Sequence, residues 1–205
     1  MSCRRALRRW FVTAFAGSFV LFAPAPGTAH PHVWIDSIVT FVFENGRVVA
    51  IEHEWKLDEF FSNFLIESFD RDKNRRFDSA ELAELRKGAF DTLKEFGYFT
   101  YLQVNGKAVK VGEVETFAAE LFADDTVSYR FRQNLATALD PRAAKIAVSV
   151  HDETYFVETR VDPKDPVRFK GIAAGACSYQ VRDDPTKKIY MGMVPTTVIF
   201  LACTK

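Results

Sequence analysis

Two strand-like segments on either side of an Asn-Gly pair constrain the fold of this 205-residue chain more than any other feature. Residues 32–44 and 47–56 are rich in Val, Ile, Phe and Trp, which favour β-strands. Asn45 and Gly46 tolerate the positive φ angles that both central residues of a two-residue type I′ turn require. The sequence therefore predicts an antiparallel β-hairpin over residues 30–56.

After residue 56 the apolar residues no longer alternate as in a strand and instead recur at helical spacing. Residues 57–69 predict a first helix with Asp58 as its N-cap, and residues 79–96 predict a second amphipathic helix that ends at Gly97. A polar loop joins the two predicted helices. We therefore expect a helical hairpin over residues 57–97.

The rest of the chain, residues 98–205, is strand-like again. Candidate strands cover residues 98–104, 108–122 (as two strands), 126–133, 144–151, 154–161, 167–182 and 196–202. Turn residues such as Asn105 and Gly106 separate them. This order of elements predicts the α+β class: an antiparallel, β-rich and sandwich-like protein with one inserted helical hairpin.

Residues 1–29 predict an export signal, because basic residues open the segment, an apolar run follows over residues 10–23, and small residues end it at Ala29. The apolar run is shorter than the roughly 20 residues that a membrane span needs. We expect cleavage after Ala29 and a periplasmic mature protein of residues 30–205 that does not itself span the membrane. The export route stays open, since Arg8 and Arg9 suit the twin-arginine pathway but Leu7 stands where Ser or Thr is usual.

Two cysteines, Cys177 and Cys203, lie in the predicted mature part. An oxidising compartment favours a disulfide between them. A thiolate metal site is the alternative, but neither residue has another cysteine at ligand spacing. We therefore predict the disulfide.

The charge balance excludes a typical nucleic-acid binder. The whole chain has 27 basic and 27 acidic residues, and four of the basic residues lie in residues 1–29, which hold no acidic residue. The mature part is therefore mildly acidic and has no basic run.

Histidines gather where the mature chain is predicted to begin. Cleavage after Ala29 would leave His30 as the first residue, with a terminal amine beside its imidazole, and His32 two positions further on. Imidazole nitrogens are common ligands for transition metals. Pro31 has no N–H, so the terminal copper and nickel motif that uses deprotonated backbone amides cannot form here.

The predicted hairpin brings two further candidate ligands to this end. A two-residue turn at Asn45 and Gly46 would pair Ile38 with His53 and place His53 diagonally across from Asp36 on one face. The sequence then predicts a site for Ni²⁺, Co²⁺, Zn²⁺ or Cu²⁺, with Asp36 as a ligand or as the group that orients a histidine. Its candidate residues are His30, His32, Asp36 and His53.

Each of these residues also has a simpler interpretation. His53 stands among apolar residues, and a lone histidine in a strand is more often a core or surface residue than a ligand. Asp36 is also interpretable as a capping or ion-pairing residue. A bulge in either strand would move His53 to the other face. His151 is expected at the surface, where a strand enters a turn.

The twelve residues 70–81 have the oxygen spacing of a calcium-binding EF-hand loop. Asp70, Asp72, Asn74, Asp78 and Glu81 occupy positions 1, 3, 5, 9 and 12. Arg75 replaces the usual glycine at position 6, where φ is positive, and basic neighbours reduce the negative charge. We expect either weak Ca²⁺ binding or a metal-free helix-loop-helix whose acidic residues pair with the basic ones.

The motif from His30 to Asp36, together with Asp152, Tyr155 and Phe156, resembles the domain of unknown function 1007 family, often described as a periplasmic component of an ABC-type transport system. Members of that family are commonly associated with nickel and cobalt efflux permeases, so the resemblance implies periplasmic handling of a transition metal. A two-lobed solute receptor is not expected, because the chain lacks βαβ alternation.

Taken together, these features predict a periplasmic, non-enzymatic accessory protein that binds a transition metal for a membrane permease. The alternative is a non-catalytic interaction protein that docks on a permease and binds calcium weakly at the helical hairpin. No catalytic triad, phosphate loop or dinucleotide motif is present in the sequence, and the remaining catalytic option is a copper site at a terminal histidine.

Overall fold

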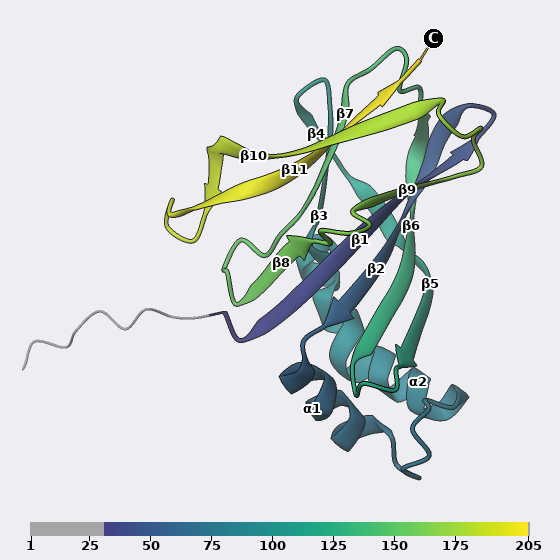
Figure 1. The fold of residues 1–205 in the computed structure, drawn as a ribbon, viewed down its shortest axis with the longest axis vertical. Coiled ribbons are helices and arrows are strands. Elements are labelled where there is room, and N and C mark those ends of the chain that lie inside the picture. The colour runs from purple at the N-terminus through teal and green to yellow at the C-terminus, as the bar shows by residue number, and fades with distance from the viewer. Residues whose placement is uncertain (1–30, 205) are drawn as a thin grey trace, which may run out of the picture.

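The computed structural model describes residues 31–204, which form two β-sheets and a helical segment (Figure 1). Sheet A has six strands in the order β5-β6-β2-β1-β8, with β9 also paired to β1. Its strands are β1 (Val33–Glu44), β2 (Arg47–Leu57), β5 (Val111–Leu121), β6 (Val127–Leu139), β8 (Val157–Val161) and β9 (Val167–Lys170).

Sheet B has five strands in the order β10-β11-β7-β3-β4. Its strands are β3 (Thr100–Val104), β4 (Lys107–Val109), β7 (Ile146–Val150), β10 (Cys177–Ile189) and β11 (Val194–Cys203). Apolar residues from both sheets and from the helical segment share one hydrophobic core, consistent with a β-rich sandwich.

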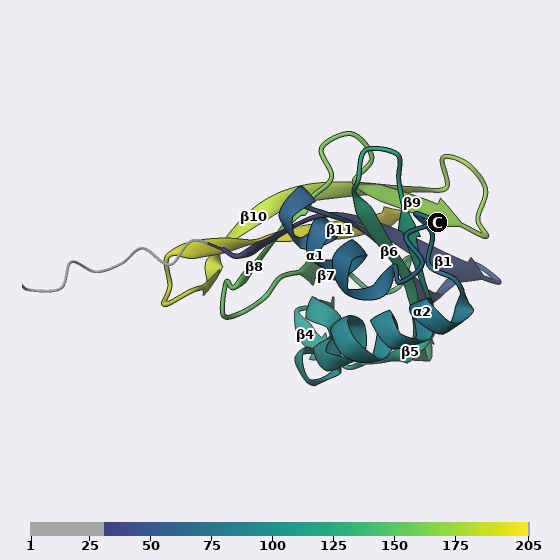
Figure 2. The same cartoon turned by 90° about the horizontal axis from the view of Figure 1, so that it is seen from below.

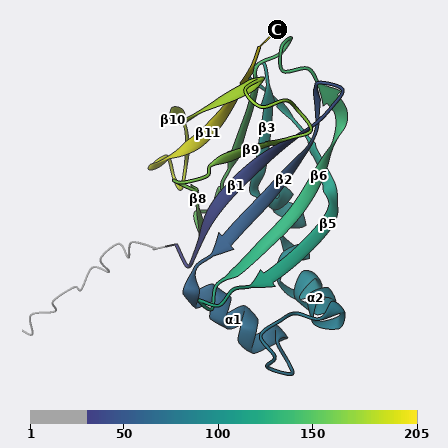
Figure 3. The same ribbon diagram turned by 45° about the vertical axis from the view of Figure 1, so that its right-hand side comes forward.

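The segment between β2 and β3 is helical. Helix α1 (Glu59–Phe69) begins at Asp58, whose carboxylate accepts a hydrogen bond from the Phe61 N–H at 2.9 Å. Helix α2 (Ser79–Leu85) lies beside α1 at the end of sheet A where β2 ends (Figure 2, Figure 3). None of the helices in residues 31–204 is long and apolar enough to cross a membrane.

The second helix is shorter than the predicted span of residues 79–96. The chain continues from α2 as a π-helical turn, η1 (Arg86–Phe90), and a 3₁₀ segment, η2 (Asp91–Phe99). These changes of pitch rotate successive residues around the axis and bring Phe90 fully into the core, where its ring lies 4.1 Å from that of Phe117. Gly97 has φ = 59°, which breaks the helix at the predicted residue.

The hairpin of β1 and β2 turns at Asn45 and Gly46, with φ angles of 51° and 73°. This confirms the predicted turn. The pairing then shifts between Val42 and Phe43: Phe43 faces Val48, whereas Val42 faces Ala50, so Val49 is an extra residue in β2.

Sheet A is mixed, which corrects the expectation of a purely antiparallel protein. Strand β1 pairs with β2 on one side, and with β8 and β9, both parallel to it, on the other. The candidate strand over residues 167–182 is in fact two strands, because β9 belongs to sheet A and β10 to sheet B. Gly171 stands at the crossing, where φ is 79° and an added Cβ would lie 2.2 Å from the Phe43 carbonyl oxygen.

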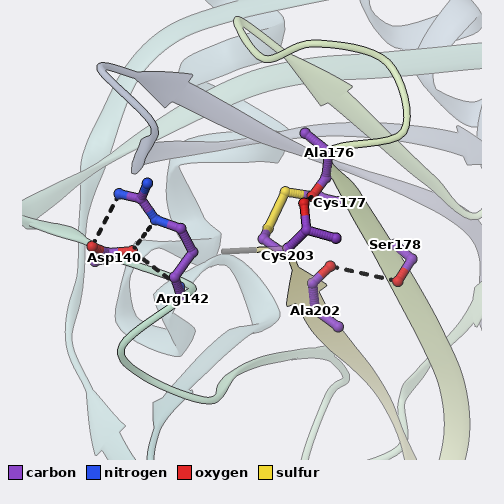
Figure 4. The surroundings of a disulfide bond; sticks show 8 residues. Asp140, Arg142, Ala176, Cys177, Ser178, Ala202 and Cys203 are labelled. Atoms are coloured by element: carbon purple, nitrogen blue, oxygen red, sulfur yellow. Dashed lines mark hydrogen bonds and ion pairs between the residues drawn. A yellow bond between two sulfur atoms is a disulfide. The ribbon is translucent and has the colours of Figure 1, made fainter.

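Cys177 and Cys203 form the predicted disulfide (Figure 4). The two residues face each other at the open end of the hairpin formed by β10 and β11. Strand β10 is an edge strand held by β11, and the disulfide closes the hairpin where its two strands begin and end.

Candidate functional site

The predicted metal ligands at the start of β1 lie in different environments. His30 lies outside the described residues. His32 is exposed, its backbone N–H donates to the Phe156 carbonyl oxygen at 2.8 Å, and its ring lies 4.7 Å from the Phe156 ring. The parallel pairing of β8 with β1 therefore brings a histidine and an exposed aromatic ring together at this edge.

Asp36 lies on the partly exposed face of β1 and is engaged by a cation. The Arg160 guanidinium on β8 donates to its carboxylate, at 2.9 Å from Nη2 and 3.1 Å from Nε. The same guanidinium lies 5.6 Å from the centre of the Trp34 ring. Asp36 is thus part of a surface ion pair, one of the two simpler interpretations given above.

His53 does not join this group, because the predicted hairpin register is wrong. The extra residue Val49 shifts β2 by one position, so that His53 faces Val39 instead of Ile38. Since side chains alternate along a strand, His53 lies on the core face of sheet A, whereas Asp36 lies on the other face.

The surroundings of His53 are those of a core residue. It is 2% exposed, its ring stacks on Phe131 with the centroids 4.6 Å apart, and its Nε2 lies 3.2 Å from the Thr100 hydroxyl oxygen. That hydroxyl donates to the Tyr98 carbonyl oxygen, so Nε2 carries the proton and donates to Thr100. Burial lowers the pKa of His53 to about 3, and the imidazole is therefore neutral.

His151 is also buried, contrary to its expected surface position. Its ring stacks on Tyr101 with a centroid separation of 4.0 Å, and its Nδ1 lies 3.1 Å from the Ser149 hydroxyl. Burial, the larger cause, and the nearby Lys187 ammonium together lower its pKa to about 4. All five residues of β7 are buried, so the alternation that would mark His151 as exposed is absent.

The 70–81 loop, in contrast, gathers three of its five predicted ligands. One carboxylate oxygen from each of Asp70, Asp72 and Glu81 lies within 4.8 Å of the others. Asp70 and Glu81 are each only 5% exposed. Backbone N–H groups hold them in place: Arg75 donates to Asp70 at 3.0 Å, and Asp78 donates to Glu81 at 2.9 Å.

We call Asp70, Asp72 and Glu81 the acidic group. The other two predicted ligands, Asn74 and Asp78, are hydrogen-bonded to residues of this group. Asn74 donates its side-chain amide to Asp72 at 2.7 Å. Asp78 is the N-cap of α2 and accepts from the Glu81 N–H at 2.9 Å, which completes a capping box with Glu81. The start of the second helix and the position of the Glu81 carboxylate are therefore set together.

The basic residues of the loop do not neutralise the acidic group. Arg71 forms an ion pair with Glu84, and Arg75 with Asp125. Within residues 31–204, no ion pair involves a carboxylate of the acidic group. Two buried carboxylates and a third close by thus lack a cationic side-chain partner, an arrangement that attracts a cation.

Sequence reasoning missed Arg160 as the partner of Asp36. The segment was expected to form a strand, and it does so as β8. The strand next to β8 could not be identified from the sequence, because side chains alternate in the same way in parallel and antiparallel strands. Arg160 is also 124 residues away from Asp36 along the chain.

The fold and these residues define a two-sheet β-rich protein with an acidic loop between two helices. The chain belongs to the family described as a protein of unknown function (DUF1007), whose model matches residues 15–192. It is also similar to an uncharacterized 15.5 kDa protein in the trpE 3′ region of Spirochaeta aurantia. The two are 34% identical over 137 residues, which cover 67% of this chain and 96% of that protein.

Proposed function

We propose that this chain is a non-enzymatic, cation-binding protein of the bacterial periplasm whose 70–81 loop holds one calcium ion. The observation that carries the proposal is the acidic group itself. Its oxygens lie within 4.8 Å of one another, two of its three residues are buried, and its charge has no side-chain counter-ion in residues 31–204. Carboxylate oxygens are the ligands that Ca²⁺ prefers.

The local backbone supports an EF-hand-like interpretation of the loop. Arg75, at position 6, has φ = 65°, the left-handed conformation for which EF-hands use glycine. Asp78 at position 9 begins the second helix, and Glu81 at position 12 points its carboxylate back to the loop. In this proposal Asp70, Asp72 and Glu81 are the primary ligands, with Asn74 and Asp78 completing the shell.

The expected affinity is low. Only three carboxylates converge, and four basic residues lie within the loop, so the dissociation constant should be in the range of extracellular modules, about 10⁻⁴ to 10⁻³ M. A single loop has no paired partner with which to open a groove, so the ion would stabilise the helical hairpin instead of acting as a switch.

The proposed role of the hairpin is to dock on a membrane metal permease. Phe60 and Phe64 of α1 are exposed, and exposed aromatic residues are typical of protein interfaces. A calcium ion that fixes the loop would also fix the angle between α1 and α2, and hence the surface presented by α1.

A second candidate function is capture of Ni²⁺, Co²⁺, Zn²⁺ or Cu²⁺ for that permease by the histidines at the start of β1. The observation that favours it is that His32 is exposed at the start of β1, where its imidazole is accessible to an ion in solution. Because Asp36 is held by Arg160 and His53 lies on the opposite face, the proposed ligands reduce to His30 and His32.

The calcium proposal is tested by the Glu81→Gln variant, with Glu84→Gln as the matched control. Glutamine retains the capping box but loses the bidentate carboxylate, whereas Glu84 lies one turn further along α2 outside the acidic group. With 10 mM Ca²⁺ and a dissociation constant of about 1 mM, the parent should gain about 1.4 kcal/mol of unfolding free energy relative to EDTA.

Thermal unfolding in EDTA and in Ca²⁺ measures this gain. We expect it in the parent and in Glu84→Gln but not in Glu81→Gln. An equal response in all three proteins, or none in the parent, refutes the calcium site.

The transition-metal candidate is tested separately. Exported protein, with its first residue fixed by intact mass, is titrated with each of the four ions, and the His30→Ala/His32→Ala variant and a His53→Phe variant are compared with it. The proposal requires loss of binding in the first variant and retention in the second. Co-purification with the permease tests the docking role, with Phe60→Ser/Phe64→Ser expected to abolish it.

A further inference from the structure

Both methionines within residues 31–204, Met191 and Met193, lie in one exposed turn. This turn, residues 190–193, joins β10 to β11 and is called the methionine turn here. It lies at the same end of the molecule as the start of β1 (Figure 1, Figure 3). The two side chains are 85% and 58% exposed, and no other large apolar side chain in that part of the chain is more exposed than Met191. Methionine is therefore absent from the described core and concentrated at one accessible point.

The backbone of the methionine turn does not favour the residues that it holds. Residues 190–192 have successive φ angles of 49°, 54° and 82°. In two other turns of residues 31–204, a residue with positive φ also precedes a glycine with positive φ, and that residue is asparagine in both, Asn45 and Asn105. Asparagine adopts this left-handed conformation more readily than methionine does. An exposed Met191 at this position thus costs stability and gains no packing in return.

Contacts with the loop before β8 hold the backbone of the turn. The Tyr190 N–H donates to the Glu153 carbonyl oxygen at 3.4 Å, and the Tyr190 ring lies 5.3 Å from the Tyr155 ring. Within the turn, the Met193 N–H donates to the Tyr190 carbonyl oxygen at 3.1 Å. The backbone is thus fixed, while both methionine side chains extend into solvent, where a dissolved ion can reach their sulfur atoms.

Two thioether sulfurs at this spacing suit a soft monovalent cation. Met191 and Met193 are two positions apart, so their Cα atoms are separated by at most about 7 Å. Each side chain has three rotatable bonds, through which its sulfur can reach a shared ion. Thioethers are soft ligands that select Cu(I). Residues 189–194 offer no carboxylate, imidazole or thiol, and Lys187 and Lys188 precede them, so a hard divalent cation finds neither its preferred ligands nor a favourable charge.

We propose that the methionine turn binds one Cu(I) ion through the sulfur atoms of Met191 and Met193. A role for the sulfur accounts for an apolar side chain at an exposed turn position that asparagine fills twice elsewhere in this chain. The site shares no residue with the acidic group or with His30 and His32, so it depends on neither proposed function. Ag(I) has the same charge and soft character and should bind in the same place.

Competition with bicinchoninate, a coloured chelator of Cu(I), measures this binding under nitrogen. The full chain carries Cys3→Ser, His30→Ala and His32→Ala, so that no free thiol and no exposed imidazole contributes. We expect the protein to withdraw one Cu(I) per chain from the chelator. Met191→Asn and Met193→Leu, each added to this chain, should weaken the binding by about tenfold or more, because each removes one of the two thioethers.

Methyl signals of methionine identify the ligands directly. The same chain is labelled with [methyl-¹³C]methionine, and the two single variants assign the signals of Met191 and Met193 in NMR spectra. One equivalent of Ag(I) should shift both signals, because both sulfur atoms bind the ion. One equivalent of Ca²⁺ should shift neither, which separates this site from the calcium site of the 70–81 loop.

Urea unfolding separates the loss of a ligand from the loss of the fold. Met191→Asn introduces the residue that the two similar turns use, so its unfolding midpoint should lie above that of the parent. Higher stability together with weaker Cu(I) binding would show that Met191 is present for its sulfur. The proposal is overturned if the chelator keeps all the Cu(I) in the presence of the unchanged turn. It is equally overturned if Met191→Asn and Met193→Leu withdraw Cu(I) as well as that turn does.

Discussion

His53 should make the stability of this protein depend on pH, because the fold holds its imidazole neutral. The pKa is about 3 in the folded chain and 6.5 in the unfolded chain. Between these values the unfolded chain binds more protons than the folded one, so stability is present above pH 6.5 and is lost as the pH falls towards 3. A hydrogen bond with the Gln133 side chain raises the pKa, but burial is the larger cause and lowers it.

The size of this effect follows from the two pKa values. At pH 5, protonation of His53 in the unfolded chain alone favours unfolding by about 2 kcal/mol relative to pH 7. The His53→Phe variant retains a ring against Phe131 but cannot be protonated. Its loss of unfolding free energy between pH 7 and pH 5 should therefore be smaller than that of the parent by about 2 kcal/mol.

Urea unfolding followed by tryptophan fluorescence at pH 7, 6 and 5 measures this difference. His32→Phe, at an exposed position, is the control and should retain the full loss. The parent also carries His151, whose pKa is lowered to about 4, so a part of its acid sensitivity remains in His53→Phe. Parallel curves for the parent and His53→Phe would refute the reasoning.

Three further changes test individual parts of the fold. Replacing Cys177 and Cys203 by serine opens a disulfide that spans 26 residues, and the free energy of unfolding should fall by about 3.5 kcal/mol. Urea unfolding measures this loss, and an unchanged midpoint would contradict the prediction. Arg75→Gly relieves a φ of 65° and should raise the stability by up to about 1 kcal/mol and tighten Ca²⁺ binding, both measurable by thermal unfolding with and without Ca²⁺. Asp58→Ala removes acceptors for the first turn of α1 and for the Trp34 N–H at 2.7 Å, and should cost about 1–2 kcal/mol, while Asp58→Asn should retain most of the stability.

Local features of this fold were predictable because short segments of sequence decide them. Asn45 and Gly46 favour positive φ, Asp58 caps a helix, and Gly97 ends one, whatever the rest of the chain does. The spacing of oxygens from Asp70 to Glu81 is equally local, and the structure brings three of those residues together.

The position of His53 could not be predicted in the same way, because the bulge at Val49 involves three strands. The pairing of β2 with β6 shifts at the same place, from Val48 facing Leu139 to Ala50 facing Asn134. A bulge of this kind reflects the twist of the whole sheet, and no residue type at Val49 marks it. One extra residue was enough to separate a predicted ligand from its partners.

The position of β1 inside sheet A sets the order in which the protein can be completed. This strand is made first, yet one of its sides stays open until residues 157–170 exist to cover it. A ribosome or translocation channel that releases the chain from its N-terminus therefore leaves an apolar strand edge exposed for most of synthesis. We expect the nascent chain to depend on a holding chaperone, and truncations that end before residue 157 to aggregate instead of folding.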